Sequence, residues 1–148
     1  MSRTLAREDA FKLIFEMEIT GISGEDAIKY LYETVNKSNE MWAQEFVSAS
    51  NRIYIESIIG GVSENDEELT SKIEENLKDW SLSRISKVCL AILKLALYEI
   101  YYLEDIPVKV SASEAVLLAK KYAGKEESSF VNGVIGSVLK TFESIEEK

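Results

Sequence analysis

Two features of the sequence contain residues that could bind a metal ion or act as a nucleophile. The first is an acidic run, Glu64, Asp66, Glu67 and Glu68, whose carboxylates could hold a cation. It lacks the spaced ligands, central glycine and final glutamate of an EF-hand loop, and acids in the first turn of a helix are stabilised by the helix dipole. The second is Cys89, which lies in the most apolar stretch of the chain. We therefore interpret the acids as a helix start and Cys89 as a core residue, and expect no metal site.

Other residues and motifs typical of catalysis are scarce. The 148 residues include no histidine, which excludes His-based nucleophile triads and the commonest general acid and base. The phosphate-binding pattern G-x-x-x-x-G-K-[ST], the dinucleotide pattern G-x-G-x-x-G and the hydrolase pattern G-x-S-x-G do not occur. The residues therefore give little support to catalysis.

The charge of the chain is unevenly distributed. Its 17 Lys and Arg and 26 Asp and Glu give a formal net charge of −9. Residues 13–77 sum to −10, whereas residues 78–125 sum to +3. An acidic protein repels a phosphate backbone as a whole, but a local basic region still attracts one. The alternative interpretation is that both regions are ordinary solvated charged faces.

The elements that must position these residues are helices. One proline and seven glycines are too few to form the many turns that a many-stranded sheet requires. Apolar residues also recur at helical spacing. The pattern predicts seven helices, over about 1–20, 24–35, 40–59, 64–77, 84–103, 109–123 and 129–143. The helix over 84–103 is apolar on nearly every side, so we expect it to be buried. Gly60 and Gly61 are predicted to end the third helix and to divide one domain, 1–148, into subdomains of roughly 1–61 and 62–148.

No segment is predicted to cross a membrane. The most apolar run, Val88 to Leu103, is interrupted by Lys94 and Glu99 and is shorter than the roughly 20 residues that a span requires. The amino terminus is rich in charged residues and does not have the apolar core of a signal peptide. Together with the single cysteine, these features predict a cytoplasmic protein.

The region from Trp80 to Val134 carries several particular motifs in a fixed order. They are Tyr98-Glu99 at the end of an aliphatic run, Asp105-Ile106-Pro107, Glu114-Ala115-Val116 and Phe130-Val131-Asn132-Gly133-Val134. This region resembles the NusB family of bacterial transcription antitermination factors. The amino-terminal Ala6-Arg7, with Ala10, Leu13 and Phe15-Glu16, is similar to the opening helix of that family. The resemblance implies an all-α fold of two packed helical subdomains, with neither catalysis nor a cofactor.

The resemblance also implies a function and partners. Proteins of this family bind the boxA element of ribosomal RNA leader transcripts together with NusE, which is a small-subunit ribosomal protein. The pair helps RNA polymerase to read through terminators during rRNA synthesis. We therefore expect boxA-type RNA, NusE and the transcription elongation complex as partners, and a monomer or a homodimer without a membrane partner.

The residues that the resemblance assigns to RNA binding are basic or aromatic. They are Arg3, Arg7, Lys121, Tyr122 and Phe130, and Lys120 joins them as a cation next to Lys121 in the sequence. Cations hold phosphates, and aromatic faces stack on unpaired bases. Core packing is the alternative role for Tyr122 and Phe130. Glu126 and Glu127, in the loop predicted before Phe130, are implied to face the protein partner, whose basic surface their acidity would suit; a solvated loop is the alternative.

The amino terminus departs from the family pattern. The family often has a tighter arginine cluster there, whereas Glu8 and Asp9 dilute the cluster in this chain. Fewer phosphate contacts weaken RNA binding and its salt dependence. One alternative function is therefore a protein–protein adaptor of the same fold with little RNA affinity. Another is an accessory RNA-binding module of an RNA cytosine methyltransferase, because helical domains of this kind occur attached to such enzymes.

Overall fold

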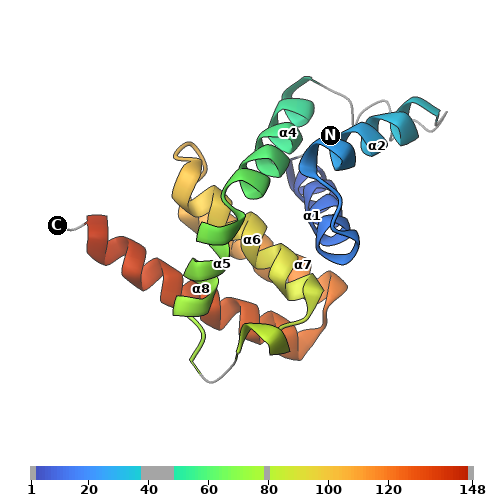
Figure 1. Ribbon diagram of the computed structural model, residues 1–148. Coiled ribbons are helices and arrows are strands. Elements are labelled where there is room, and N and C mark those ends of the chain that lie inside the picture. Colours follow the sequence, from blue (N-terminus) through green and yellow to red (C-terminus); the bar gives the residue numbers. More distant parts are fainter. Residues whose placement is uncertain (1–2, 38–48, 79–80, 147–148) are drawn as a thin grey trace. The chain divides into compact units, whose positions relative to one another are not determined.

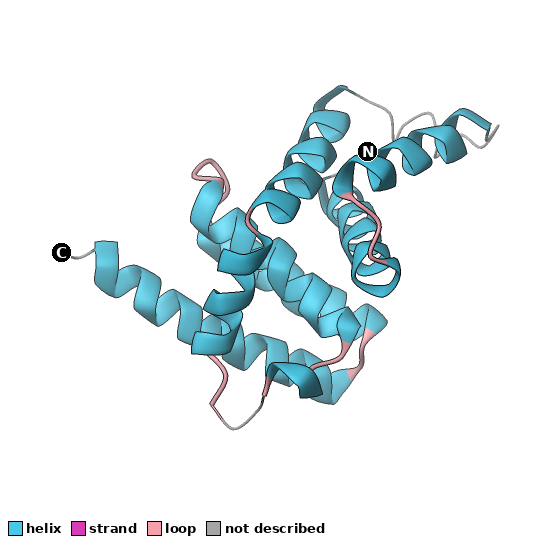
Figure 2. Cartoon of the chain, in the orientation of Figure 1, coloured by secondary structure: helices cyan, strands magenta, loops and turns pink. Residues whose placement is uncertain are grey.

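The structure is a computed structural model that describes residues 3–37, 49–78 and 81–146. All regular elements in these residues are helical, and seven of them are α-helices (Figure 2). The all-helical fold expected from the sequence is therefore confirmed. The chain divides into two compact units, Met1–Glu64 and Asn65–Lys148.

The first unit contains three helices in its described residues. They are α1 (Arg3–Thr20), α2 (Gly24–Lys37) and α4 (Ala49–Glu64), and each contacts the other two (Figure 1). The apolar residues of α1 and α4 supply most of the buried side chains, including Ile14, Ile55 and Ile58. Gly24 marks a close approach of α2 to α4, because a Cβ atom at this position would overlap with Ser63 and press on Ile59.

The expected end of the third predicted helix is wrong, because α4 continues through Gly60 and Gly61 to Glu64. A glycine costs a helix interior about 1 kcal/mol relative to alanine. Continuing the helix keeps Val62 on the same face as Ile58 and Ile59, and all three are buried. Burial of one such side chain contributes about 1.5–3 kcal/mol, which offsets the glycine cost. The first part of this predicted helix, residues 40–48, lies outside the described residues.

The second unit is built around one buried helix. It contains α5 (Asp66–Glu75), the short 3-10 helix η1 (Leu82–Arg84), α6 (Lys87–Tyr102), α7 (Val108–Tyr122) and α8 (Lys125–Glu146) (Figure 1). Helix α6 contacts α5, α7 and α8, and its residues 89–97 are all buried. The sequence prediction of a buried helix in this region is confirmed. Its first turn begins at Lys87 because the Ser86 hydroxyl accepts a hydrogen bond of 3.1 Å from the Cys89 backbone N–H.

The two charged residues that interrupt α6 are both buried and join it to other helices. Lys94 is 3% exposed and Glu99 is 1% exposed. The Lys94 Nζ atom lies 2.6 Å from Asp66 Oδ1 at the start of α5. The Ser111 hydroxyl of α7 donates a hydrogen bond of 2.7 Å to Glu99 Oε1. Within the described residues, no helix is both long and apolar enough to cross a membrane.

Candidate functional site

A tight turn joins α7 to α8 and brings most of the predicted site residues together. Gly124 adopts a φ of 113°, which favours glycine. Its N–H donates to the Ala119 carbonyl at 2.9 Å, which closes α7, and its own carbonyl accepts from the Ser128 N–H at 2.9 Å. The last turn of α7 and the first turns of α8 are therefore neighbours, because a two-residue connection holds them together.

The basic and aromatic residues of this junction lie on both helices. Lys120 and Lys121 are exposed at the end of α7, and Tyr122 and Phe130 are half-buried. The Lys121 ammonium lies 5.4 Å from the centre of the Tyr122 ring, within the range of a cation–π contact. The structure thus brings these four predicted residues into one region of the second unit, where two exposed cations lie near two half-buried rings.

Glu126 and Glu127 lie in a helix, which corrects the prediction of a loop over residues 125–129. Helix α8 begins at Lys125, and the two acids occupy its first turn. Carboxylates in this position interact favourably with the positive end of the helix dipole. The Ser128 hydroxyl also donates to the Lys125 carbonyl at 2.9 Å. The polar composition that resembled a loop therefore belongs to a helix start.

Two hollows of similar size have Phe130 in common. We call the first, of about 220 Å³, the Glu126 hollow; it is lined by Arg84, Ile85, Ser86, Cys89, Glu126, Glu127 and Phe130. We call the second, of about 230 Å³, the Lys78 hollow; it is lined by Asn76, Leu77, Lys78, Ser129, Phe130, Gly133 and Val134. Among these described residues, the Glu126 hollow has two acids and one arginine, whereas the Lys78 hollow has one lysine and no acid. The charged side chains among the described lining residues therefore differ between the two hollows.

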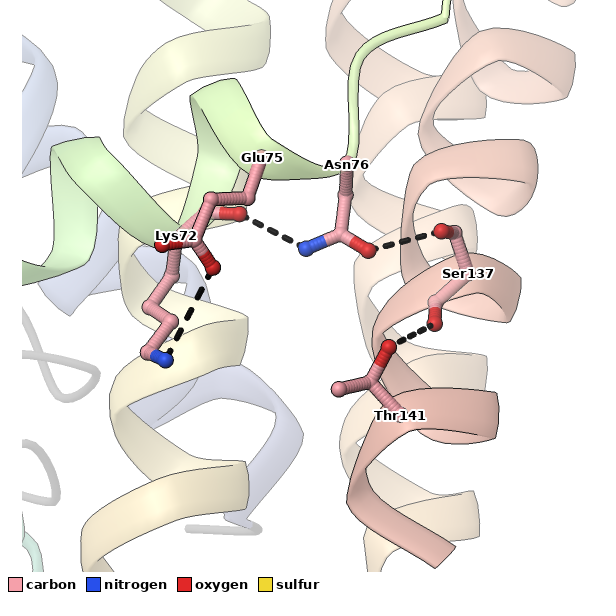
Figure 3. Close-up of polar contacts among 5 residues, drawn as sticks. All are labelled: Lys72, Glu75, Asn76, Ser137 and Thr141. Carbon is pink, nitrogen blue, oxygen red and sulfur yellow. Dashed lines mark hydrogen bonds and ion pairs between the residues drawn. The ribbon is translucent and has the colours of Figure 1, made fainter. Parts of the chain in front are cut away.

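Asn76 holds the end of α5 against α8 beside the Lys78 hollow (Figure 3). Its amide nitrogen donates to the Lys72 carbonyl at 2.7 Å, which caps the last turn of α5. Its amide oxygen accepts a hydrogen bond of 2.6 Å from the Ser137 hydroxyl on α8. Asn76 therefore fixes where the chain leaves α5, and so where Leu77 and Lys78 lie.

Cys89 is part of the Glu126 hollow but is not activated as a nucleophile. Burial raises the pKa of its thiol; the neighbouring Glu127 raises it further, while a contact with Ser86 opposes the rise. A thiol with a raised pKa remains protonated at neutral pH. Among the described residues, no three His, Cys, Asp or Glu side chains are grouped so that they could hold a metal ion.

Arg3 and Arg7 belong to the first unit, where both lie beside one tyrosine. Their guanidinium carbons lie 4.5 Å and 5.9 Å from the centre of the Tyr54 ring. Arg3 is exposed, whereas Arg7 is only 4% exposed and Tyr54 is also buried. The Arg7 side chain thus contributes to the packing of α1 on α4. Burial raises the pKa of the neighbouring Asp9 to about 6, with Glu8 adding to the rise and Lys12 opposing it, so Asp9 is still mainly ionised at pH 7.

Sequence reasoning missed Asn76, Lys78 and Arg84 as residues of the junction. They precede Phe130 by more than 40 positions, and no local pattern connects the end of α5 or η1 to the start of α8. The sequence did contain a signal that could have identified Gly133 as a residue of the junction, because Gly133 lies in the same motif as Phe130. The fold and this junction define an all-helical binding protein, with charged and aromatic side chains gathered where two helices meet.

Comparison with known proteins identifies the family. Residues 4–140 match the model of the NusB family, and the chain belongs to this family. The transcription antitermination protein NusB of Clostridium acetobutylicum is 47% identical over 143 residues, which cover 97% of this chain and 98% of that protein. NusB of Acetivibrio thermocellus is 44% identical over 95% of this chain and 90% of its own length.

Solved structures show the same fold. NusB of T. maritima is 32% identical with a TM-score of 0.73, covering 95% of this chain and 92% of that chain. A crystal structure of the antitermination factors NusB and NusE in complex with dsRNA contains a chain that is 26% identical, with a TM-score of 0.78. That match covers 94% of this chain and 96% of the other.

Proposed function

We propose that this protein is a transcription antitermination factor that binds boxA-type RNA of rRNA transcripts together with NusE, without catalysing a reaction. The single observation that carries the proposal is membership of the NusB family over nearly the whole chain. A related chain is part of a complex of NusB, NusE and dsRNA. The cations and rings at the α7–α8 junction supply the chemistry that an RNA strand needs. We further propose that it acts in the cytoplasm on the transcription elongation complex, as a monomer or a homodimer.

We assign RNA contacts to Lys120, Lys121, Tyr122 and Phe130 of the second unit and, separately, to the exposed Arg3 of the first unit. Arg7 supports the first unit's contact indirectly, since its side chain is buried beside Tyr54. The protein partner is assigned to Glu126 and Glu127. The two carboxylates line a hollow in which they outnumber the one arginine among the described residues, so a basic side chain of a ribosomal protein fits there by charge.

Fluorescence anisotropy with labelled boxA RNA tests the RNA assignment. We expect NusE to increase the affinity for boxA over a scrambled RNA of equal length. The variant Lys120→Ala/Lys121→Ala should bind more weakly, and the slope of log K against log salt should fall by about 0.7 for each phosphate that the variant no longer neutralises. Lys109→Ala, an exposed lysine in the first turn of the same helix, is the control. Equal affinity for boxA and scrambled RNA in the presence of NusE would contradict the proposed function.

A charge reversal at Glu126 tests the partner assignment. Glu126 is exposed, so Glu126→Lys changes the charge that a basic partner meets and leaves the core unchanged. We expect association with NusE to weaken about tenfold at low salt, mainly through a slower on-rate, and the difference to shrink as salt is added. Glu74→Lys, at an exposed acid of α5, is the matched control. Equal effects of the two variants in surface plasmon resonance would show that only the net charge matters.

An adaptor with little RNA affinity is the second candidate function. It is favoured by the burial of Arg7 and by the two acids, Glu8 and Asp9, that follow it. These features leave fewer exposed cations on α1 for phosphate contacts. The anisotropy experiment separates the two candidates, because the adaptor binds NusE normally but gains no boxA preference from it.

A further inference from the structure

Helix α7 has an exposed face that carries two aliphatic side chains. The helix packs against α6 and α8 with its other side (Figure 1), whereas Val110 is 41% exposed and Leu117 is 53% exposed. Seven residues make almost two full turns, so these two side chains lie on the same face, about 10 Å apart along the helix axis. Single exposed apolar residues are common on protein surfaces, but a pair at this spacing matches the seam along which two helices pack.

Lysines lie at both ends of this pair, in a chain that is acidic as a whole. Lys109 is next to Val110, and Lys120 and Lys121 follow Leu117 by one turn. All three lysines are exposed, and within the described part of the chain no acid forms an ion pair with Lys109 or Lys120. We call these five residues the α7 face. Its charged ends attract acidic groups, and its middle offers apolar contact.

We propose that the α7 face binds an acidic amphipathic helix of a protein partner other than NusE. The apolar residues of that helix cover Val110 and Leu117, and its carboxylates pair with the lysines at the two ends of the face. Amphipathic helices are recognised in this way, through apolar anchors about two turns apart with charged residues beside them. This surface goes beyond the proposed function, and its charge is opposite to that of Glu126 and Glu127.

The side chains of the α7 face disfavour the other possible occupants. RNA is attracted to the lysines, but proteins recognise unpaired bases with aromatic rings and arginine planes, which Val110 and Leu117 do not offer. A second copy that sets Val110 on Leu117 in an antiparallel pair brings the two Glu114 carboxylates together at the two-fold axis, where like charges repel. A basic ribosomal protein is repelled by the lysines. An acidic helix meets none of these obstacles.

Two synthetic peptides test the charge of the occupant. Each consists of three heptads with leucine at positions a and d; one has glutamate at positions e and g, and the other has lysine there. In fluorescence anisotropy with the full chain, we expect the glutamate peptide to bind at least about tenfold more tightly than the lysine peptide, because the lysines of the α7 face repel the second peptide. Added salt should reduce the difference. Equal affinities for the two peptides would overturn the proposal.

Leu117→Gln tests whether the apolar pair makes the contact. Glutamine is about as good a helix former as leucine, and Leu117 is exposed, so the thermal midpoint should stay the same. The affinity for the glutamate peptide should fall about tenfold, as expected when one leucine is no longer buried in the complex. The matched control is Ile53→Gln, which removes an aliphatic side chain that is 68% exposed on α4 of the first unit. The control should stay within about twofold of the wild type, and an equal loss in both variants would contradict the proposal.

Measurements on the same Leu117→Gln variant distinguish the other occupants. Sedimentation velocity would assign the face to a second copy if the wild type were a dimer that this variant dissociates. Weaker binding of boxA RNA in the presence of NusE would assign the face to RNA, and weaker binding of NusE alone would assign it to NusE. We expect none of these changes, and any of them would overturn the proposal. A wild type without preference for boxA contradicts only the proposed function, because the peptide experiments contain no RNA.

Discussion

Asp66→Asn should lower the free energy of unfolding by about 2 kcal/mol, although it only replaces one carboxylate oxygen with an amide nitrogen on a half-exposed side chain. Asp66 Oδ1 lies 2.6 Å from Lys94 Nζ, and the lysine side chain is only 4% exposed whereas the aspartate side chain is 52% exposed. The substitution removes the negative charge that lies next to the buried Lys94 ammonium. Loss of one partner of a fully buried pair costs about 3–5 kcal/mol, and solvent at Asp66 reduces this figure.

Urea denaturation of the Asp66→Asn variant measures this effect. The midpoint should fall while the m-value stays the same, since the change affects stability and not compactness. Glu67→Gln makes the same type of change at the neighbouring exposed acid of the same turn, and it should shift stability by less than about 0.5 kcal/mol. A double-mutant cycle with Lys94→Met should give a coupling energy of about 1 kcal/mol or more. A coupling energy of zero would show that the short Lys94–Asp66 contact contributes nothing to stability.

Ser111→Ala should destabilise the second unit by about 2 kcal/mol. The Ser111 hydroxyl donates a hydrogen bond of 2.7 Å to Glu99 Oε1, and the two residues are 2% and 1% exposed. Without the hydroxyl, a buried carboxyl group loses a donor that water cannot easily replace. Hydrogen bonds to charged groups contribute about 1.5–3 kcal/mol, which is more than bonds between neutral groups.

Ser113→Ala is a close control for Ser111→Ala. Ser113 lies two positions further along α7 and is exposed. Both substitutions make the same gain in helix propensity, so the difference between the two variants isolates the bond to Glu99. Thermal unfolding should place Ser111→Ala well below Ser113→Ala. Equal melting temperatures would show that the Ser111–Glu99 bond does not help to hold α7 to α6.

Local patterns in the sequence were sufficient to predict the all-helical fold class and the buried helix α6. The apolar run at residues 88–103 could only be a buried helix, because it is too short and too charged for a membrane, and residues 89–97 are all buried. Local patterns failed at two helix ends. Gly60 and Gly61 lie inside α4, where burial of Val62 offsets their cost. The polar residues after Gly124 begin α8, because Glu126 and Glu127 suit a helix start as well as a loop.

The residues of the candidate site likewise fall into those that the sequence identified and those that only the structure brought together. The sequence, through its family resemblance, assigned the lysines, Tyr122 and Phe130 to one binding role, but it predicted a loop between Gly124 and Phe130; the structure replaced that loop with a short turn and the start of α8. The sequence could not show that Arg7 is buried beside Tyr54, or that Lys78 shares a hollow with Phe130. Helix periodicity and capping depend on residues a few positions apart, whereas these contacts join helices that are distant along the chain. Only packing decides which faces of such helices meet, so the sequence determined which helices form and the tertiary structure decided which of their residues form a site.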